Sequence, residues 1–289
     1  MIVWLASYPK SGNTWFRALL SNYLSDSDEP VDINKMATGP IASARVYFDE
    51  CIGVAASDLT FPEVVRLRPQ VYRQLAQGRS FPLFVKAHDA YLYSLEGDPV
   101  FPPEATRAAL YLVRNPLDVC ISYAHHNDCP IEQAITMMAD PKHQLAPRGG
   151  GLPGQLPQRL GSWSGHVRSW LRSKLPVQVI RYEDLKADTQ AVFSNALAFC
   201  GLECDPGRVR KAVEFADFKK LKQQESEKGF QEKPINAKSF FRQGRSGGWR
   251  DQLTPNQVEQ IVSDHSEVMA ELGYELPQVL PGCREGNKE

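Results

Sequence analysis

The sequence predicts an α/β fold, built on a central, mostly parallel sheet with helices on both faces. Four apolar runs carry this prediction, and each of them ends in polar or charged residues. Helical patterns follow three of the four runs. Continuous apolar strands that alternate with helices are typical of a parallel sheet covered on both sides. Ligands of such sheets bind beyond the carboxyl ends of the strands, so the polar endings are expected at one rim.

The first element lies within residues 4–20, WLASYPKSGNTWFRALL. It begins as an apolar strand, breaks at Pro9 and resumes as an apolar pattern at helical spacing, with KSGNT (10–14) at the junction. A glycine-bearing turn from strand to helix presents free backbone N–H groups and the positive end of the helix dipole, which together form an anion site. Lys10 adds a positive charge, so the turn suits a phosphate, although it does not match the G-x-x-x-x-G-K-[ST] loop that holds magnesium nucleotides.

Three further apolar runs predict the remaining strands: residues 80–88 (SFPLFVKAH), 107–114 (RAALYLVR) and 177–185 (VQVIRYEDL). The last run contains two adjacent carboxylates, Glu183 and Asp184. Neighbouring residues on a strand point in opposite directions, so we expect this pair to be solvated at the strand end rather than to act together.

Two helix starts are marked by their capping residues. Residues 115–118, NPLD, offer an N-cap, a proline at the first helical position and a carboxylate at the third. Residues 254–257, TPNQ, repeat this plan with a glutamine. The second helix is expected to run to about Leu272, with Gly273 as its stop.

The chain, residues 1–289, is expected to form one domain, because its length and its 42% apolar content suit one large α/β unit. Residues 26–78 carry a mixed, mainly helical pattern and are expected to form an insertion over the sheet. Residues 140–162 are rich in glycine and proline, which favours a long, flexible loop.

The overall composition excludes several classes of partner. The 33 basic and 34 acidic residues nearly cancel, so no global field favours nucleic acid or an anionic membrane. No apolar run is long enough to cross a bilayer, and Pro9 and Lys10 interrupt the opening segment, unlike a signal peptide. We therefore expect a soluble, cytoplasmic protein. The six cysteines form no C-x-x-C pair and give little indication of zinc.

Three motifs, in order over almost the whole chain, resemble one family. Residues 8–15, YPKSGNTW, look like the Y-P-K-S-G-T-T-W loop for the 5′-phosphosulfate in sulfotransferases that use 3′-phosphoadenosine 5′-phosphosulfate (PAPS). Residues 114–122, RNPLDVCIS, are similar to that family's 3′-phosphate segment, and residues 241–249, FRQGRSGGW, to its R-K-G-x-x-G-D-W motif. The resemblance implies the P-loop-like sulfotransferase fold, PAPS as the donor, 3′-phosphoadenosine 5′-phosphate (PAP) as the product, and no metal.

The resemblance also assigns residues to the donor. Those implied for the 5′-phosphosulfate are Lys10, Ser11, Gly12, Asn13 and Thr14, and those implied for adenine are Trp15, Tyr182 and Phe218. Those implied for the 3′-phosphate are Arg114, Ser122, Arg242, Gln243 and Gly244. Gln243 replaces the family's lysine and Gly248 its aspartate, so one positive contact is missing, for which Arg245 is a candidate substitute.

Lys86 and His88, in LFVKAHDAY, are expected to carry the catalysis. Two residues apart on a strand, they share one face and can address one reacting centre. A histidine suits the removal of a hydroxyl proton near neutral pH, and the family's base stands in the matching K-T-H segment. The resemblance implies an in-line attack on sulfur with His88 as the general base, while Lys10 and Lys86 stabilise the growing charge. The remaining histidines are interpreted as packed or solvated: His125, His126, His143, His166 and His265.

The acceptor is expected to be a small molecule with a reacting hydroxyl, or an amine. The family's T-H-L-P reads AHDA here, so Asp89 is expected to make the mouth of the acceptor pocket more polar. Residues 161–170, GSWSGHVRSW, and the compact length look similar to bacterial sulfotransferases of small molecules or secondary metabolites. Candidates to line the pocket are the loop 140–162 and the side chains Tyr91, Tyr93, Tyr123 and Trp163.

Assembly and reaction class leave alternatives open. Residues 250–259 resemble a dimer motif of cytosolic sulfotransferases and imply a homodimer, although helix capping explains Thr254 and Pro255 without a partner. A P-loop kinase would use the turn after the first strand for ATP and magnesium, but it would leave the three ordered motifs unexplained. A protein that holds a nucleotide without turnover is the other alternative, and Lys86 with His88 argues against it.

Overall fold

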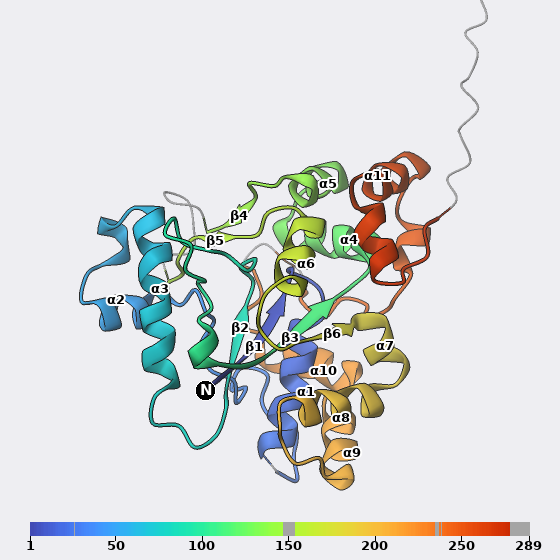
Figure 1. The fold of residues 1–289 in the computed structure, drawn as a ribbon. Coiled ribbons are helices and arrows are strands. Elements are labelled where there is room, and N and C mark those ends of the chain that lie inside the picture. Colours follow the sequence, from blue (N-terminus) through green and yellow to red (C-terminus); the bar gives the residue numbers. More distant parts are fainter. Residues whose placement is uncertain (26, 147–153, 235–236, 238, 278–289) are drawn as a thin grey trace, which may run out of the picture.

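The computed structural model describes residues 1–25, 27–146, 154–234, 237 and 239–277, and a four-stranded sheet lies at its centre (Figure 1). The strand order is β2–β1–β3–β6, and every neighbouring pair is parallel. The predicted α/β fold with a parallel sheet is confirmed. The four strands are β1 (Ile2–Ser7), β2 (Leu83–Ala87), β3 (Thr106–Val113) and β6 (Val177–Arg181).

Helices cover both faces of this sheet. In chain order they are α1 (Asn13–Ser25), α2 (Arg45–Ile52), α3 (Phe61–Ala76), α4 (Pro116–Asn127), α5 (Ile131–Ala139), α6 (Trp163–Leu171), α7 (Tyr182–Ala187), α8 (Thr189–Phe199), α9 (Pro206–Phe215), α10 (Phe218–Lys228) and α11 (Pro255–Glu271). Short 3₁₀ turns are η1 (Ala56–Asp58), η2 (Pro103–Ala105) and η3 (Gly248–Asp251).

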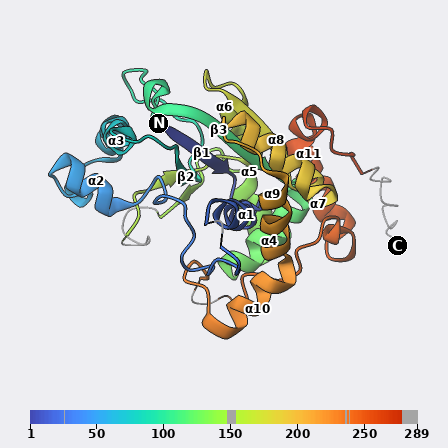
Figure 2. The same cartoon turned by 90° about the horizontal axis from the view of Figure 1, so that it is seen from below.

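Strand β1 divides the core into two layers. Its residues are all buried, and alternate side chains point to opposite faces, as the period of a strand requires. Trp4 belongs to an apolar cluster with residues of α3, α4, α6 and α11, whereas Leu5 belongs to a second cluster with residues of α1, α8, α9 and α10. Figures 1 and 2 show α1 beside α9 in this second layer. Burial on both faces explains why the first run is apolar without alternation.

Both predicted helix starts are confirmed. The Asn115 side chain accepts a hydrogen bond from the backbone N–H of Leu117, and Pro116 opens α4. Thr254 and Gln257 form a reciprocal capping box at the start of α11. That helix ends where predicted, and Gly273 has a φ of 72° in the left-handed region that favours glycine.

The segments flanking the sheet contain some regular structure. Residues 26–78 hold α2, η1 and α3. Within residues 140–162, β4 (Gln144–Leu145) pairs antiparallel with β5 (Gln158–Arg159), and residues 147–153 lie outside the described part of the chain. Backbone hydrogen bonds join Arg45 to Gly154 and Leu156 to Ser43, so the end of this segment is held against the insertion.

The last apolar run ends earlier than predicted. Strand β6 stops at Arg181, and α7 begins at Tyr182, because two carboxylates in the first turn favour a helix start. The expectation that Glu183 and Asp184 lie on a strand was therefore wrong. Asp184 is exposed, but Glu183 is half-buried and accepts hydrogen bonds from the Asn115 backbone N–H and the Tyr274 hydroxyl, both at 3.0 Å.

None of the helices within the described ranges combines the length and the apolar character needed to cross a bilayer. The cysteines in the same part of the chain are free thiols, at positions 51, 120, 129, 200 and 204. Position 283 lies outside the described residues.

Candidate active site

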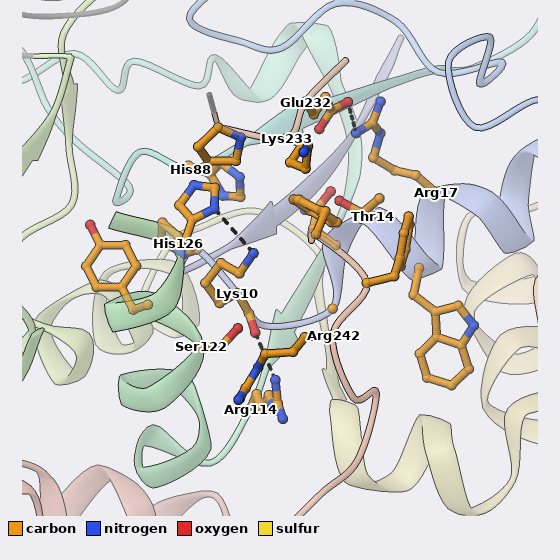
Figure 3. A pocket seen from close by; sticks show the side chains of 18 of the residues that line it. Lys10, Thr14, Arg17, His88, Arg114, Ser122, His126, Glu232, Lys233 and Arg242 are labelled. Carbon is orange, nitrogen blue, oxygen red and sulfur yellow. Dashed lines mark hydrogen bonds and ion pairs between the residues drawn. The ribbon is translucent and has the colours of Figure 1, made fainter. Parts of the chain in front are cut away.

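The carboxyl ends of the four strands open into one cavity of about 1020 Å³ (Figure 3). Lys10 follows β1, His88 follows β2, Arg114 follows β3, and Tyr182 follows β6, and all four line the cavity. The structure thus brings the polar endings to one rim, as the parallel sheet requires. Of the residues implied for the donor and for catalysis, all except Ser11 line this cavity.

The turn after β1 is shaped around glycine. Gly12 has a φ of 96°, and a Cβ atom there would stand 2.7 Å from the ring of Tyr182. Lys10 also adopts a positive φ, of 71°. The Asn13 side chain donates to the carbonyl oxygen of Leu5 at 2.8 Å and to the Ser7 hydroxyl at 3.1 Å, which ties the first turn of α1 to the strand. The turn therefore holds the N-terminus of α1, with its unpaired N–H groups, at the cavity.

Cations converge on this turn. Burial, followed by repulsion from Lys86, Arg114 and Arg242, lowers the pKa of Lys10 to about 7. Arg114 donates to the backbone oxygens of Lys10 and Arg245, yet its buried Nε has no hydrogen-bond partner among the described residues. A half-buried group of like charges with an unpaired donor has the properties of an anion site.

Asp118 ties the carboxyl-terminal motif to this site. Its carboxylate accepts from the backbone N–H groups of Gly247 at 2.7 Å and Trp249 at 3.1 Å. Gly244, with a φ of 58°, lies so close to the Phe218 ring that a Cβ atom would overlap it. Arg245, the candidate substitute for the missing lysine, donates to Gln243 and forms an ion pair with Asp251 at 2.9 Å, so part of its charge is already neutralised.

Three aromatic side chains implied for adenine lie at the same side of the cavity. The rings of Trp15 and Tyr182 meet edge to face with centroids 5.7 Å apart. Trp15 Nε1 donates to the carbonyl oxygen of Ala216 at 3.0 Å, which fixes the ring, and Phe218 opens α10 two residues later. The Arg114 guanidinium stacks 4.5 Å over the Tyr182 ring.

The surroundings of His88 determine its protonation. Nδ1 lies 2.9 Å from the carbonyl oxygen of Ser7, which can only accept, so Nδ1 carries the hydrogen and Nε2 keeps its lone pair. Burial, followed by the charge of Lys86, places the pKa of His88 well below its ordinary value. The ring is therefore a neutral imidazole with one free basic nitrogen.

Two residues that the sequence did not single out, Glu232 and Arg17, complete the surroundings of Lys86. Lys86 Nζ lies 2.8 Å from Glu232, whose other oxygen lies 2.6 Å from Arg17. Burial raises the pKa of Glu232, but the two cations outweigh it and lower the pKa to about 2. No motif contains Glu232, and only the folded chain brings residues 17, 86 and 232 together.

The expectation for Asp89 was wrong. Its side chain is fully buried, and Arg68 of α3 holds both carboxylate oxygens, at 2.8 and 2.7 Å. A buried carboxylate requires a partner of this kind, so Asp89 faces the insertion and not the cavity. Among the four aromatic candidates, Tyr123 lines the cavity. Tyr91 and Trp163 are buried in the core, and Tyr93 is exposed away from it.

The histidines that were interpreted as packed or solvated divide into two groups. Three of them form hydrogen bonds with neighbouring hydroxyl groups: His143 with Tyr123, His166 with Tyr111, and His265 with Ser164. His166 also donates to the backbone oxygen of His88 at 3.0 Å. His126, in contrast, lines the cavity, with Nδ1 3.4 Å from Lys10 Nζ, a position that the sequence did not predict. His125 accepts from Arg242 at 3.0 Å.

Over the described ranges, no group of three or more His, Cys, Asp or Glu side chains is arranged to hold a metal ion.

Residues 2–273 match the family model described as the sulfotransferase domain. The chain belongs to this family. Cytosolic sulfotransferase 12 of Arabidopsis thaliana is 26% identical over 277 residues, which cover 89% of this chain and 74% of the relative. Sulfotransferase 1A1 of Rattus norvegicus is 25% identical over 281 residues, which cover 94% of this chain and 86% of the relative. The predicted family and sulfotransferase activity are confirmed.

Solved structures show the same fold. Retinol dehydratase in a complex with retinol and PAP superposes on this sulfotransferase with a TM-score of 0.61 and 19% identity, over 95% of this chain and 83% of that one. Mouse sulfotransferase SULT7A1 complexed with PAP gives a TM-score of 0.57 and 20% identity, over 92% and 84%. The fold expected from the motifs is confirmed.

Proposed function

We propose that this sulfotransferase moves a sulfuryl group from PAPS to a hydroxyl group of a small molecule, with His88 as the general base. The observation that carries the proposal is one cavity in which a half-buried group of cations lies beside a neutral histidine whose Nε2 keeps its lone pair. The cations suit the phosphates of the donor, and the histidine suits an acceptor that must lose a proton.

The residues present fit the donor. The unpaired Nε of Arg114 and the mutual repulsion of the cations both call for an anion. Gly12 and Gly244 keep the cavity wall free of side chains next to Tyr182 and Phe218. We assign the 5′-phosphosulfate to residues 10–14, and the remaining contacts to Trp15, Arg114, Ser122, Tyr182, Phe218, Arg242, Gln243 and Gly244.

The protein's own groups have distinct tasks in the reaction. His88 takes the proton of the acceptor hydroxyl at Nε2, because the Ser7 carbonyl holds the other nitrogen as a donor. Lys10 and Lys86 place positive charge where negative charge grows. The bound donor supplies the sulfuryl group, which passes to the acceptor oxygen as its bond to phosphate breaks and leaves PAP. A general base contributes about 10²- to 10⁴-fold to such a rate.

The names of relatives support a small hydroxylated acceptor. Flavonol 3-sulfotransferase of Flaveria bidentis is 24% identical over 282 residues, and retinol is bound in one structural neighbour. We further propose that residues 1–289 form one domain, that the protein acts in the cytoplasm of a bacterium on a secondary metabolite, and that it forms a homodimer through residues 250–259.

The proposal is tested by incubating the protein with ³⁵S-labelled PAPS and a panel of phenols, alcohols and amines, with and without magnesium. The expected result is a labelled acceptor whose formation does not depend on magnesium and is lost in His88→Ala. Nucleotide binding without transfer to any acceptor would favour a non-catalytic protein. Transfer of phosphate from ATP that requires magnesium would favour a kinase.

A further inference from the structure

His126 stands in the cavity with one ring nitrogen occupied and the other open. It lies on α4, one helical turn after Ser122, so the two side chains share the cavity face of that helix. Its Nδ1 lies 3.4 Å from Lys10 Nζ. Its Nε2 has no hydrogen-bond partner among the described residues, and Figure 3 shows the ring in the same part of the cavity as His88.

Lys10 sets the tautomer of His126. An ammonium group has three donors and no acceptor, so it can bond only to a ring nitrogen that lacks hydrogen. A bound anion holds Lys10 in its charged form, and Nδ1 of His126 must then accept. The hydrogen of the neutral imidazole is consequently on Nε2. Burial and the charges of Lys10 and Lys86 lower the pKa of His126 to about 3, which agrees with a neutral ring.

The two histidines therefore present opposite groups to one cavity. His88 donates from Nδ1 to Ser7 and offers a lone pair at Nε2, whereas His126 accepts at Nδ1 from Lys10 and offers an N–H at Nε2. Both rings line the same cavity, together with Lys86. We propose that His126 donates a hydrogen bond to a second oxygen of the acceptor while His88 takes the proton of the reacting hydroxyl.

A second oxygen is required because a hydrogen bond donated to the attacking oxygen would withdraw the electron density that the attack uses. The acceptor class is thus a polyhydroxylated small molecule, such as a diol or a sugar, with a second oxygen besides the reacting hydroxyl. This inference rests on the proposed function and narrows its acceptor.

Amide side chains in the cavity lining support the same class. Those outside the residues assigned to the donor include Asn127, Gln155, Gln158 and Gln231. Gln158 is only 2% exposed. Its Nε2 donates a hydrogen bond to Oε1 of Gln155 at 2.7 Å, but its own Oε1 has no hydrogen-bond partner within the described part of the chain. A buried amide oxygen without a partner lacks a donor, which a hydroxyl group can supply.

The tautomers are measured by long-range ¹H–¹⁵N correlation spectra of the ¹⁵N-histidine-labelled protein saturated with PAP. His88→Gln and His126→Gln assign the two rings. The expected result is hydrogen on Nδ1 of His88 and on Nε2 of His126, with the His126 pattern lost in Lys10→Met. Hydrogen on Nδ1 of His126, or a cationic ring, would overturn the inference. No response of any histidine to PAP would instead contradict the proposed function.

The acceptor class is measured with PAPS and two matched pairs, catechol with phenol and cis-1,2-cyclohexanediol with cyclohexanol. In the wild type, kcat/KM is expected to favour each diol by up to about tenfold, the worth of one good hydrogen bond. His126→Phe should abolish this preference, and His126→Gln, whose amide N–H reaches toward the position of Nε2, should retain part of it. An unchanged preference in His126→Phe, or turnover of neither diol, would overturn the inference.

Discussion

The carbonyl oxygen of Ser7 accepts a hydrogen bond from Nδ1 of His88 at 2.9 Å. Ser7 ends β1, and His88 directly follows β2, whose Ala87 pairs with Ala6 of β1. The register of two parallel strands thus determines which ring nitrogen of His88 is free. The backbone of His88 is also fixed by His166, whose ring donates a hydrogen bond to the carbonyl oxygen of His88. The base is therefore positioned by the sheet itself.

Replacing His88 should separate catalysis from donor binding. In His88→Ala we expect kcat to fall by about 10²- to 10⁴-fold, because the proton of the acceptor then has no base. The affinity for PAP should change little, because the phosphates are assigned to residues 10–14, Arg114, Ser122 and residues 242–244, and not to His88. Steady-state kinetics and calorimetric titration of PAP measure the two effects. His265→Gln, whose ring bonds to Ser164 and does not line the cavity, is the control and should retain turnover.

Donor binding should weaken as the pH rises above about 7. The pKa of Lys10 in the nucleotide-free protein is about 7, mainly because of burial, so the side chain is increasingly neutral above that pH. A bound phosphate raises this pKa, so binding takes up a proton, and the affinity for PAP should fall by a factor that approaches ten per pH unit.

Calorimetry between pH 7 and 9, in buffers of different ionisation enthalpy, measures this proton uptake. In Lys10→Met the affinity should be lower throughout, and its dependence on pH in this range should be much weaker. An equal slope in Lys10→Met and the wild type would assign the uptake to another group.

The ion pair of Arg68 with Asp89 should be important for stability. Arg68→Ala leaves a fully buried carboxylate without its partner, which costs about 3–5 kcal/mol of unfolding free energy. Arg73→Ala, on the same helix, removes an exposed pair with Glu104 and should cost less than about 1 kcal/mol. Urea denaturation compares the two variants, and equal losses would contradict the account of Asp89.

Gly244→Ala tests whether the approach of Phe218 shapes the donor site. The backbone φ is 58°, and the added methyl group would overlap the Phe218 ring. Gly78→Ala is a matched control, since its φ of 67° gives similar backbone strain but its Cβ would meet no atom within 4 Å. Both variants should lose about 1–2 kcal/mol of stability from the strain. Only Gly244→Ala should also weaken PAP binding, as measured by calorimetry.

The features that the sequence could predict are local in the chain. The strand, turn and helix of residues 2–25 follow from an apolar run, a glycine and a helical pattern, and the starts of α4 and α11 follow from their caps. Lys86 and His88 could be placed together because the period of a strand puts them on one face. The polar ends of the four runs could be placed at one rim because the strands are parallel.

The features that it could not predict depend on contacts between distant segments. Asp89 looked like a polar group at the cavity, because no pattern indicates that Arg68 of the insertion would bury it. Glu232 reaches Lys86 across 146 residues of sequence. His126 differs from the packed histidines only through its spacing of four from Ser122, a signal that helical periodicity does contain.

The most direct test of the donor site is the shift in melting temperature caused by PAP, compared with ADP in the presence and absence of magnesium. A ligand at a hundred times its dissociation constant stabilises a protein by about 2.7 kcal/mol, which is readily measured. We predict that PAP stabilises the protein without magnesium and that ADP does so much less, because Arg114 and Ser122 bind the 3′-phosphate. Equal or greater stabilisation by ADP with magnesium would contradict the assignment of the cavity to PAPS.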